Sequence, residues 1–178
     1  MNKIELLRKM FELSSKSDTD CCIDLAKREI VNSIYSSSKI EGIDTTLENT
    51  QDIIEKGEAF GVKGNDVLFV TNMKRSWEFI LSTLEDEITL DYLIQLHKLL
   101  GNCIIFPVGE VRVDNAPISG TVWKPGIPNI ADIELNLIRI SRIDDSVERV
   151  LEYVCYLCKT QIFIDGNKRL AQLIANKV

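Results

Sequence analysis

The stretch Phe163-Ile164-Asp165-Gly166-Asn167-Lys168-Arg169, near the C-terminus, decides how this sequence is interpreted. Gly166 can adopt backbone conformations that are closed to other residues, and Asp165 and Asn167 are typical turn and N-cap residues. From Arg169 onward the apolar residues recur at helical spacing. The sequence therefore predicts a turn that leads directly into a helix, with the charges of Lys168 and Arg169 at the helix start.

A helix start of this kind is suited to binding an anion. The first backbone N–H groups of a helix have no helical partner and attract anions, and arginine grips phosphate oxygens in a fork. Asp165 is of the residue type that holds the Mg²⁺ accompanying a polyphosphate. An ordinary charged helix start has the same appearance, so the turn alone leaves both interpretations open.

Composition limits the class of protein. A length of 178 residues with 45% hydrophobic residues suits one domain with a sizeable core, and the net charge of −6 disfavours nucleic acid as a partner. The N-terminus is charged where a signal peptide needs an apolar run, and no stretch approaches the ~20 apolar residues of a membrane span. We therefore expect a cytoplasmic protein without a membrane partner.

The five cysteines are an odd number, which argues against a disulfide framework. Cys155 and Cys158 have the CxxC spacing of some zinc and redox sites, but no second pair accompanies them and His97 is the only histidine. Because the pair lies in a predicted helix over residues 147–163, we expect buried thiols that pack as small hydrophobes.

Helical periodicity dominates the chain, which predicts an all-α fold. Helices are expected over 4–13, 23–38, 45–57, from 65 or 66 to 81, over 89–100, from 132 to 140 and over 147–163, with caps at Thr45, at Asn65 or Asp66, and at Thr89. All four prolines lie between Pro107 and Pro128, among β-branched residues. This region is where we expect short strands or a hairpin.

The C-terminal run resembles the signature loop of the Fic family, His-x-Phe-x-(Asp/Glu)-Gly-Asn-(Gly/Lys)-Arg-x-x-Arg. The match runs from Phe163 to Arg169, and two positions depart: the family histidine falls on Gln161 and the second arginine on Gln172. The resemblance thus includes the phosphate cradle and excludes the residue that transfers the proton.

Ser37-Ser38-Lys39-Ile40-Glu41-Gly42 resembles the inhibitory motif of the same family, (Ser/Thr)-x-x-x-Glu-(Gly/Asn). In members with an N-terminal inhibitory helix, the glutamate reaches the second arginine and blocks the productive pose of the γ-phosphate. The resemblance implies regulatory roles for Ser37, Glu41 and Gly42, with Arg169 or Lys168 as substitute partners because Gln172 is uncharged. A plain helix end followed by glycine is the alternative.

Residues 109–125, which we call the flap segment, resemble the family's flap, a hairpin that holds an extended segment of a target protein by strand addition. A plain surface hairpin is the alternative. The residues that would dock the target are Ile118, Ser119, Gly120, Thr121, Val122 and Trp123.

The three motifs stand in the family's order, so residues 30–178 are expected to form a Fic-like helical bundle with one hairpin flap, preceded by an N-terminal helical extension over residues 1–29. Many Fic domains carry a further helix after the signature helix, whereas this sequence ends at Val178. We therefore expect a short variant or a piece of a longer protein.

Similarity to Fic proteins implies transfer of AMP from ATP, with Mg²⁺, to a serine, threonine or tyrosine hydroxyl of a target protein. Asp165 would hold the magnesium and Gly166, Asn167 and Lys168 would cradle and orient phosphate oxygens. Arg169 would neutralise the developing charge. Gln161 has no useful basicity, and loss of a general base typically costs ~10²–10⁴ in rate.

Three hypotheses stay open. The first, which we favour, is a nucleotide-binding protein that has lost most or all transferase activity. The second is a histidine-independent transferase or de-AMPylase that uses Glu41, and the third is a non-catalytic regulatory or protein-binding module in which Glu41 fills the site. A structural role for His97 is favoured over a role as replacement base. The target, the nucleotide and any homo-oligomer are not determined by the sequence.

Overall fold

The computed structural model describes residues 19–115 and 122–178, with side chains in the first range from Cys22 onward. The expected helix over 4–13, most of the proposed N-terminal extension, and Ile118, Ser119, Gly120 and Thr121 of the flap segment lie outside the described residues.

The described residues form seven helices and no strand, which confirms the all-α prediction. The helices are α2 (Thr19–Ile40), α3 (Leu47–Lys56), α4 (Gly64–Ser82), α5 (Leu90–Leu100), α6 (Ile130–Ser141), α7 (Ser146–Thr160) and α8 (Asn167–Lys177). The predicted hairpin is not seen in the described parts of the flap segment, where residues 109–115 and 122–125 are irregular.

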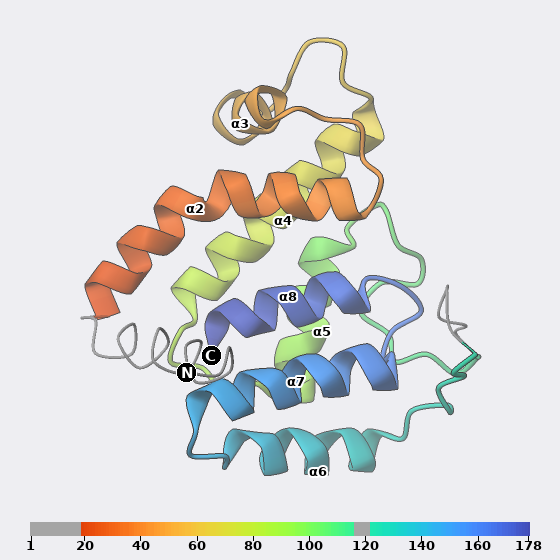
Figure 1. Cartoon of the computed structure of the whole chain (residues 1–178). Coiled ribbons are helices and arrows are strands. Elements are labelled where there is room, and N and C mark those ends of the chain that lie inside the picture. The colour runs from red at the N-terminus through yellow and green to blue at the C-terminus, as the bar shows by residue number, and fades with distance from the viewer. Residues whose placement is uncertain (1–18, 116–121) are drawn as a thin grey trace.

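Helix α8 occupies the middle of the fold. It packs against α7, α4 and α5, while α2 crosses α4 and α6 packs on the outside of α7 (Figure 1). Leu170, Leu173 and Ile174 of α8 are fully buried in the core. Because its sides are held by three other helices, α8 presents its N-terminus and the preceding loop at a fixed place on the molecule.

The helix ends show where local patterns are reliable. Thr89 caps α5 as predicted, with its side chain accepting a hydrogen bond from Tyr92 N. The prediction that Thr45 caps the next helix is wrong by one residue, since Thr46 caps α3 and Thr45 is buried. Neither Asn65 nor Asp66 caps α4, which begins at Gly64 without a side-chain cap.

The prediction of two buried thiols in α7 is wrong for Cys155 and holds in part for Cys158, which packs against the core. Cys155 is exposed and Cys158 is half-buried. Tyr153 and Leu157 are the buried residues of this helix, and Cys155 lies midway between them in sequence, which places it on the opposite face. None of the helices in the described ranges is long and apolar enough to cross a membrane.

Candidate functional site

The loop between α7 and α8 is shaped by two residues with left-handed backbone conformation. Gln161 is the C-cap of α7, with φ 50°, and Gly166 is the N-cap of α8, with φ 78°, as expected for the glycine of the turn. The N-cap is Gly166 itself rather than Asp165 or Asn167, and no side chain caps the helix. Asp165 Oδ1 instead accepts a hydrogen bond from Gly166 N at 2.6 Å. The first turn of α8 is therefore left without a side-chain acceptor.

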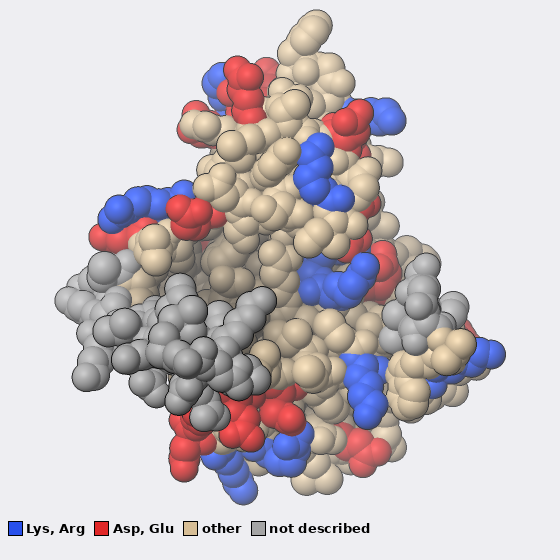
Figure 2. Space-filling model, in the orientation of Figure 1, with Lys and Arg blue, Asp and Glu red and all other residues tan. Residues whose placement is uncertain are grey.

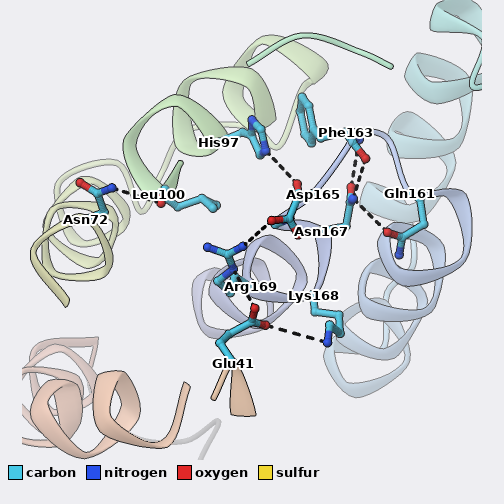
Figure 3. Close-up of polar contacts among 11 residues, drawn as sticks. Glu41, Asn72, His97, Leu100, Gln161, Phe163, Asp165, Asn167, Lys168 and Arg169 are labelled. Carbon is cyan, nitrogen blue, oxygen red and sulfur yellow. Dashed lines mark hydrogen bonds and ion pairs between the residues drawn. The ribbon is translucent and has the colours of Figure 1, made fainter. Parts of the chain in front are cut away.

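Asn167 closes the loop from inside. Its side chain is only 3% exposed, and its Oδ1 accepts a hydrogen bond from Phe163 N at 3.0 Å. Its Nδ2 donates to Phe163 O at 2.8 Å and to Gln161 Oε1 at 3.0 Å (Figure 3). Both hydrogens of the amide are used, so Asn167 could donate to a ligand oxygen only by giving up one of these bonds.

Gln161 is held on both ends of its amide. Nε2 donates to Cys158 O at 2.7 Å, within the last turn of α7, and Oε1 accepts from Asn167. The side chain at the position of the family histidine thus stabilises the loop. As a carboxamide it has no basic nitrogen that could take a proton.

His97 supports the loop from α5. Gly109 N donates to its Nδ1 at 2.8 Å, which leaves the proton on Nε2, and Nε2 donates to Asp165 O at 3.0 Å. The ring stacks on Phe163, with centroids 3.9 Å apart. Burial lowers the pKa of His97 despite the hydrogen bond to Asp165. Both ring nitrogens are bonded to backbone, so His97 is a structural histidine, as the sequence favoured.

The cationic side chains of the site meet two carboxylates. Arg169 is only 5% exposed, and its Nη2 lies 3.3 Å from Asp165 Oδ2 while its Nε lies 3.7 Å from Glu41 Oε2 (Figure 3). Lys168 is largely exposed, with Nζ 3.9 Å from Glu41 Oε1. The guanidinium carbon also lies 5.5 Å from the centre of the Phe69 ring, a contact that sequence spacing did not indicate.

Comparison with known proteins identifies the fold. No family model and no curated protein matches the sequence. Among solved structures, the chain is similar to a Fic family protein from Desulfovibrio desulfuricans, with 17% identity over 99% of this chain and 57% of that chain, and a TM-score of 0.77. It is also similar to Fic-1 from C. elegans, with 20% identity over 97% of this chain and 56% of that chain, and a TM-score of 0.77. The chain has the Fic fold.

A third Fic structure, a Fic domain containing signaling protein from Bacteroides thetaiotaomicron, gives 18% identity over 99% of this chain and 71% of that chain, with a TM-score of 0.75. The chain thus spans little more than half of the first two structures it matches. At these identities the likeness establishes the Fic fold, and the roles of individual residues have to be argued from their own contacts.

The end of α2 lies against α8 in this Fic fold. Ser37 Oγ is 2.8 Å from Gln172 Oε1 and 2.9 Å from Ser33 O. A hydroxyl has one hydrogen, so both contacts are hydrogen bonds together only if the Gln172 amide turns its NH₂ group toward Ser37. Gly42, at φ 73°, ends the helix with its N–H on Lys39 O. Position 172, where the Fic signature has its second arginine, therefore carries an uncharged glutamine in contact with Ser37.

The described end of the flap segment is anchored at α7. Trp123 is about half exposed, its Nε1 donates to Lys159 O at 3.4 Å, and Lys159 Nζ lies 5.4 Å from the ring centre. Val122 is fully exposed. A role of Val122 and Trp123 in docking a target stays a prediction.

The described residues around the loop before α8 offer few ligands for a metal ion. The described residues contain no group of three or more His, Cys, Asp and Glu side chains that could hold one. Asp165 has one carboxylate oxygen on Gly166 N and the other near Arg169. A Mg²⁺ here would be coordinated mostly by phosphate and water oxygens, which is the usual habit of this ion.

Basic and acidic side chains are interspersed over the face of the molecule shown in Figure 2.

Proposed function

We propose that the chain binds the phosphates of a nucleotide, ATP with Mg²⁺, at the N-terminus of α8, and that it has lost most or all AMP transfer to a target hydroxyl. The observation that supports binding is the combination of an uncapped helix start with a buried arginine beside it. Helix N–H groups, Arg169 and Lys168 together form an anion site of the kind that phosphates occupy.

Arg169 is incompletely paired, which favours an incoming anion. Its contacts with carboxylate oxygens at 3.3 and 3.7 Å are longer than the ~2.7–2.9 Å of strong charge-assisted hydrogen bonds. Within the described part of the chain, its buried Nε has no hydrogen-bond partner. A phosphate oxygen that reached Arg169 at normal distance would satisfy a group whose burial is otherwise costly.

The proposed loss of AMP transfer rests on which group could accept the proton of the attacking hydroxyl. The attacking hydroxyl must give up its proton, and neither Gln161 nor His97 can accept it, because the first lacks a basic nitrogen and the second has both nitrogens on backbone groups. Bound magnesium would supply charge neutralisation on the phosphates. A target protein with an extended segment docking on the flap segment remains part of the proposal.

A second candidate is a regulatory module whose site stays closed. The contacts of Glu41 with Arg169 and Lys168 favour it, because the carboxylate engages the two cations that phosphate needs. The two candidates differ in whether nucleotide displaces Glu41 from the native chain.

Titration calorimetry with Mg-ATP separates them. The proposal expects weak binding by the native chain, roughly three- to tenfold tighter binding by Glu41→Gly, and loss of binding by Arg169→Ala. Glu152→Gly, which removes a surface partner of Arg139, is the matched control and should bind like the native chain. If Glu41→Gly binds Mg-ATP and the native chain does not, the regulatory module with a closed site is the correct candidate. Unchanged affinity in Arg169→Ala would remove Arg169 from the site and contradict the proposed phosphate contact.

A further inference from the structure

Arg112, in the flap segment, is a buried cation whose partners are all backbone carbonyls. Arg112 is only 4% exposed, and burial lowers the pKa of its guanidinium. None of the ion pairs formed among the described residues includes it. Burial of a charge is costly unless dense hydrogen bonding compensates it, so such a residue points to a positional task.

The hydrogen bonds of Arg112 reach three separate places. Nε donates to Gln161 O at 2.5 Å, and Nη2 donates to Thr160 O at 3.1 Å, both at the end of α7. Nη1 donates to Asp114 O at 2.6 Å, within the flap segment, and Nη2 also donates to Gly126 O at 2.6 Å, directly after it. One planar group therefore joins both sides of the flap segment to the helix that ends at the site.

The end of α7 is a favourable place for this cation. The last carbonyls of a helix lack helical partners and carry the negative end of the helix dipole. The backbone N of Arg112 continues the pattern by donating to Ile162 O at 3.0 Å, so one residue engages three consecutive carbonyls, those of residues 160–162. These bonds hold Gln161 in its left-handed conformation, which is unfavourable for a residue other than glycine.

We propose that Arg112 is a positioning residue: it clamps residues 109–115 and 122–126 to the backbone of Gln161, so that these two described ends of the flap segment and the loop before α8 keep one fixed geometry. The consequence for catalysis rests on the proposed function, since the clamp would set where a docked target hydroxyl lies relative to position 161. The clamp itself involves no contact with nucleotide.

The task requires arginine rather than a positive charge alone. A guanidinium presents five N–H groups in a fixed plane, whereas the single ammonium of lysine presents three hydrogens from one atom. Four carbonyls on three sides cannot be reached from one nitrogen in the same way. Arg112→Lys should therefore keep the charge and lose the coupling.

Hydrogen–deuterium exchange on the full chain tests the clamp, with Arg139→Lys on the surface of α6 as matched control. We expect Arg112→Lys to speed exchange roughly tenfold or more in residues 109–115, 122–128 and 160–163 together, while α4 and the control remain at native rates. A rise in only one of these segments, an equal rise in α4, or no rise would overturn the proposal. General destabilisation would raise exchange in α4 as well, so it cannot imitate the expected pattern.

A second measurement uses the native chain and does not depend on a variant that folds. Nitrogen-15 NMR of the arginine side chains should show the Nε–H of Arg112 protected from solvent exchange and its Nη groups hindered in rotation, while those of Arg139 are averaged. Free rotation of the Arg112 Nη groups would rule out the clamp. Neither measurement uses nucleotide, so the clamp is decided independently of the proposed function.

Discussion

Replacement of Asn167 by alanine removes the side chain that closes the loop before α8. The buried N–H and C=O of Phe163 would both lose their partner, and a buried polar group left without a hydrogen bond costs ~1–3 kcal/mol. Gln161, which is only partly buried, can bind water instead. The two Phe163 groups therefore set the expected loss at about 2–6 kcal/mol of unfolding free energy. This is a large share of the ~5–15 kcal/mol that stabilises a typical domain.

Urea unfolding followed by far-UV circular dichroism measures this loss. Asn176→Ala is the matched control, because it replaces the same residue type in the same helix at an exposed position with one hydrogen bond to Gln172 O. We expect the control to stay within about 0.5 kcal/mol of the native chain. If Asn167→Ala and Asn176→Ala unfold at the same urea concentration, the loop is not held by Asn167.

Two further predictions concern the same loop. Gly166→Ala should lower the free energy of unfolding by about 1–3 kcal/mol, because φ is 78° and a Cβ atom would lie 2.9 Å from Ile105 Cδ1. The control Gly64→Ala, whose Cβ would meet nothing within 4 Å, should leave stability unchanged or slightly raised. Equal midpoints of thermal unfolding in the two variants would contradict the loop geometry. The lowered pKa of His97 means that the unfolded chain binds its proton more readily, so stability should fall as pH drops from ~6.5 toward the folded-state pKa, by at most ~1.4 kcal/mol per pH unit, and be level above that range. His97 is the only histidine, so its single imidazole signal in NMR reports the titration directly, and a midpoint at or above ~6.5 would contradict its burial between Gly109 and Asp165.

Sequence pattern was a good guide where the signal is local and periodic. The helices from α2 to α8 follow apolar periodicity, and α3 ends at Lys56 with Gly57 as its C-cap at φ 84°, close to the expected boundary of 57. Caps were less certain, since Thr45 and Thr46 are adjacent residues of the same type and only packing decides which one is buried. The same limit applies to Asp165 and Gly166 at the start of α8.

The contacts of the site required the three-dimensional structure. The expectation that Arg169 or Lys168 would replace the second arginine as partner of Glu41 agrees with the observed ion pairs. The support of Asp165 by His97 joins residues far apart in sequence, and no spacing rule reports such a pair. The partners of Arg112 are backbone carbonyls, which every residue carries, so the sequence does not indicate them.

Our proposal is that the site has kept its phosphate cradle and lost its base. It is tested most directly by intact-mass spectrometry after incubation with Mg-ATP, using the native chain, Gln161→His, and Gln161→His combined with Glu41→Gly. We expect an AMP adduct, on the protein itself or on a supplied target, only in the variants that carry the histidine. An adduct formed at comparable rate by the native chain would contradict it.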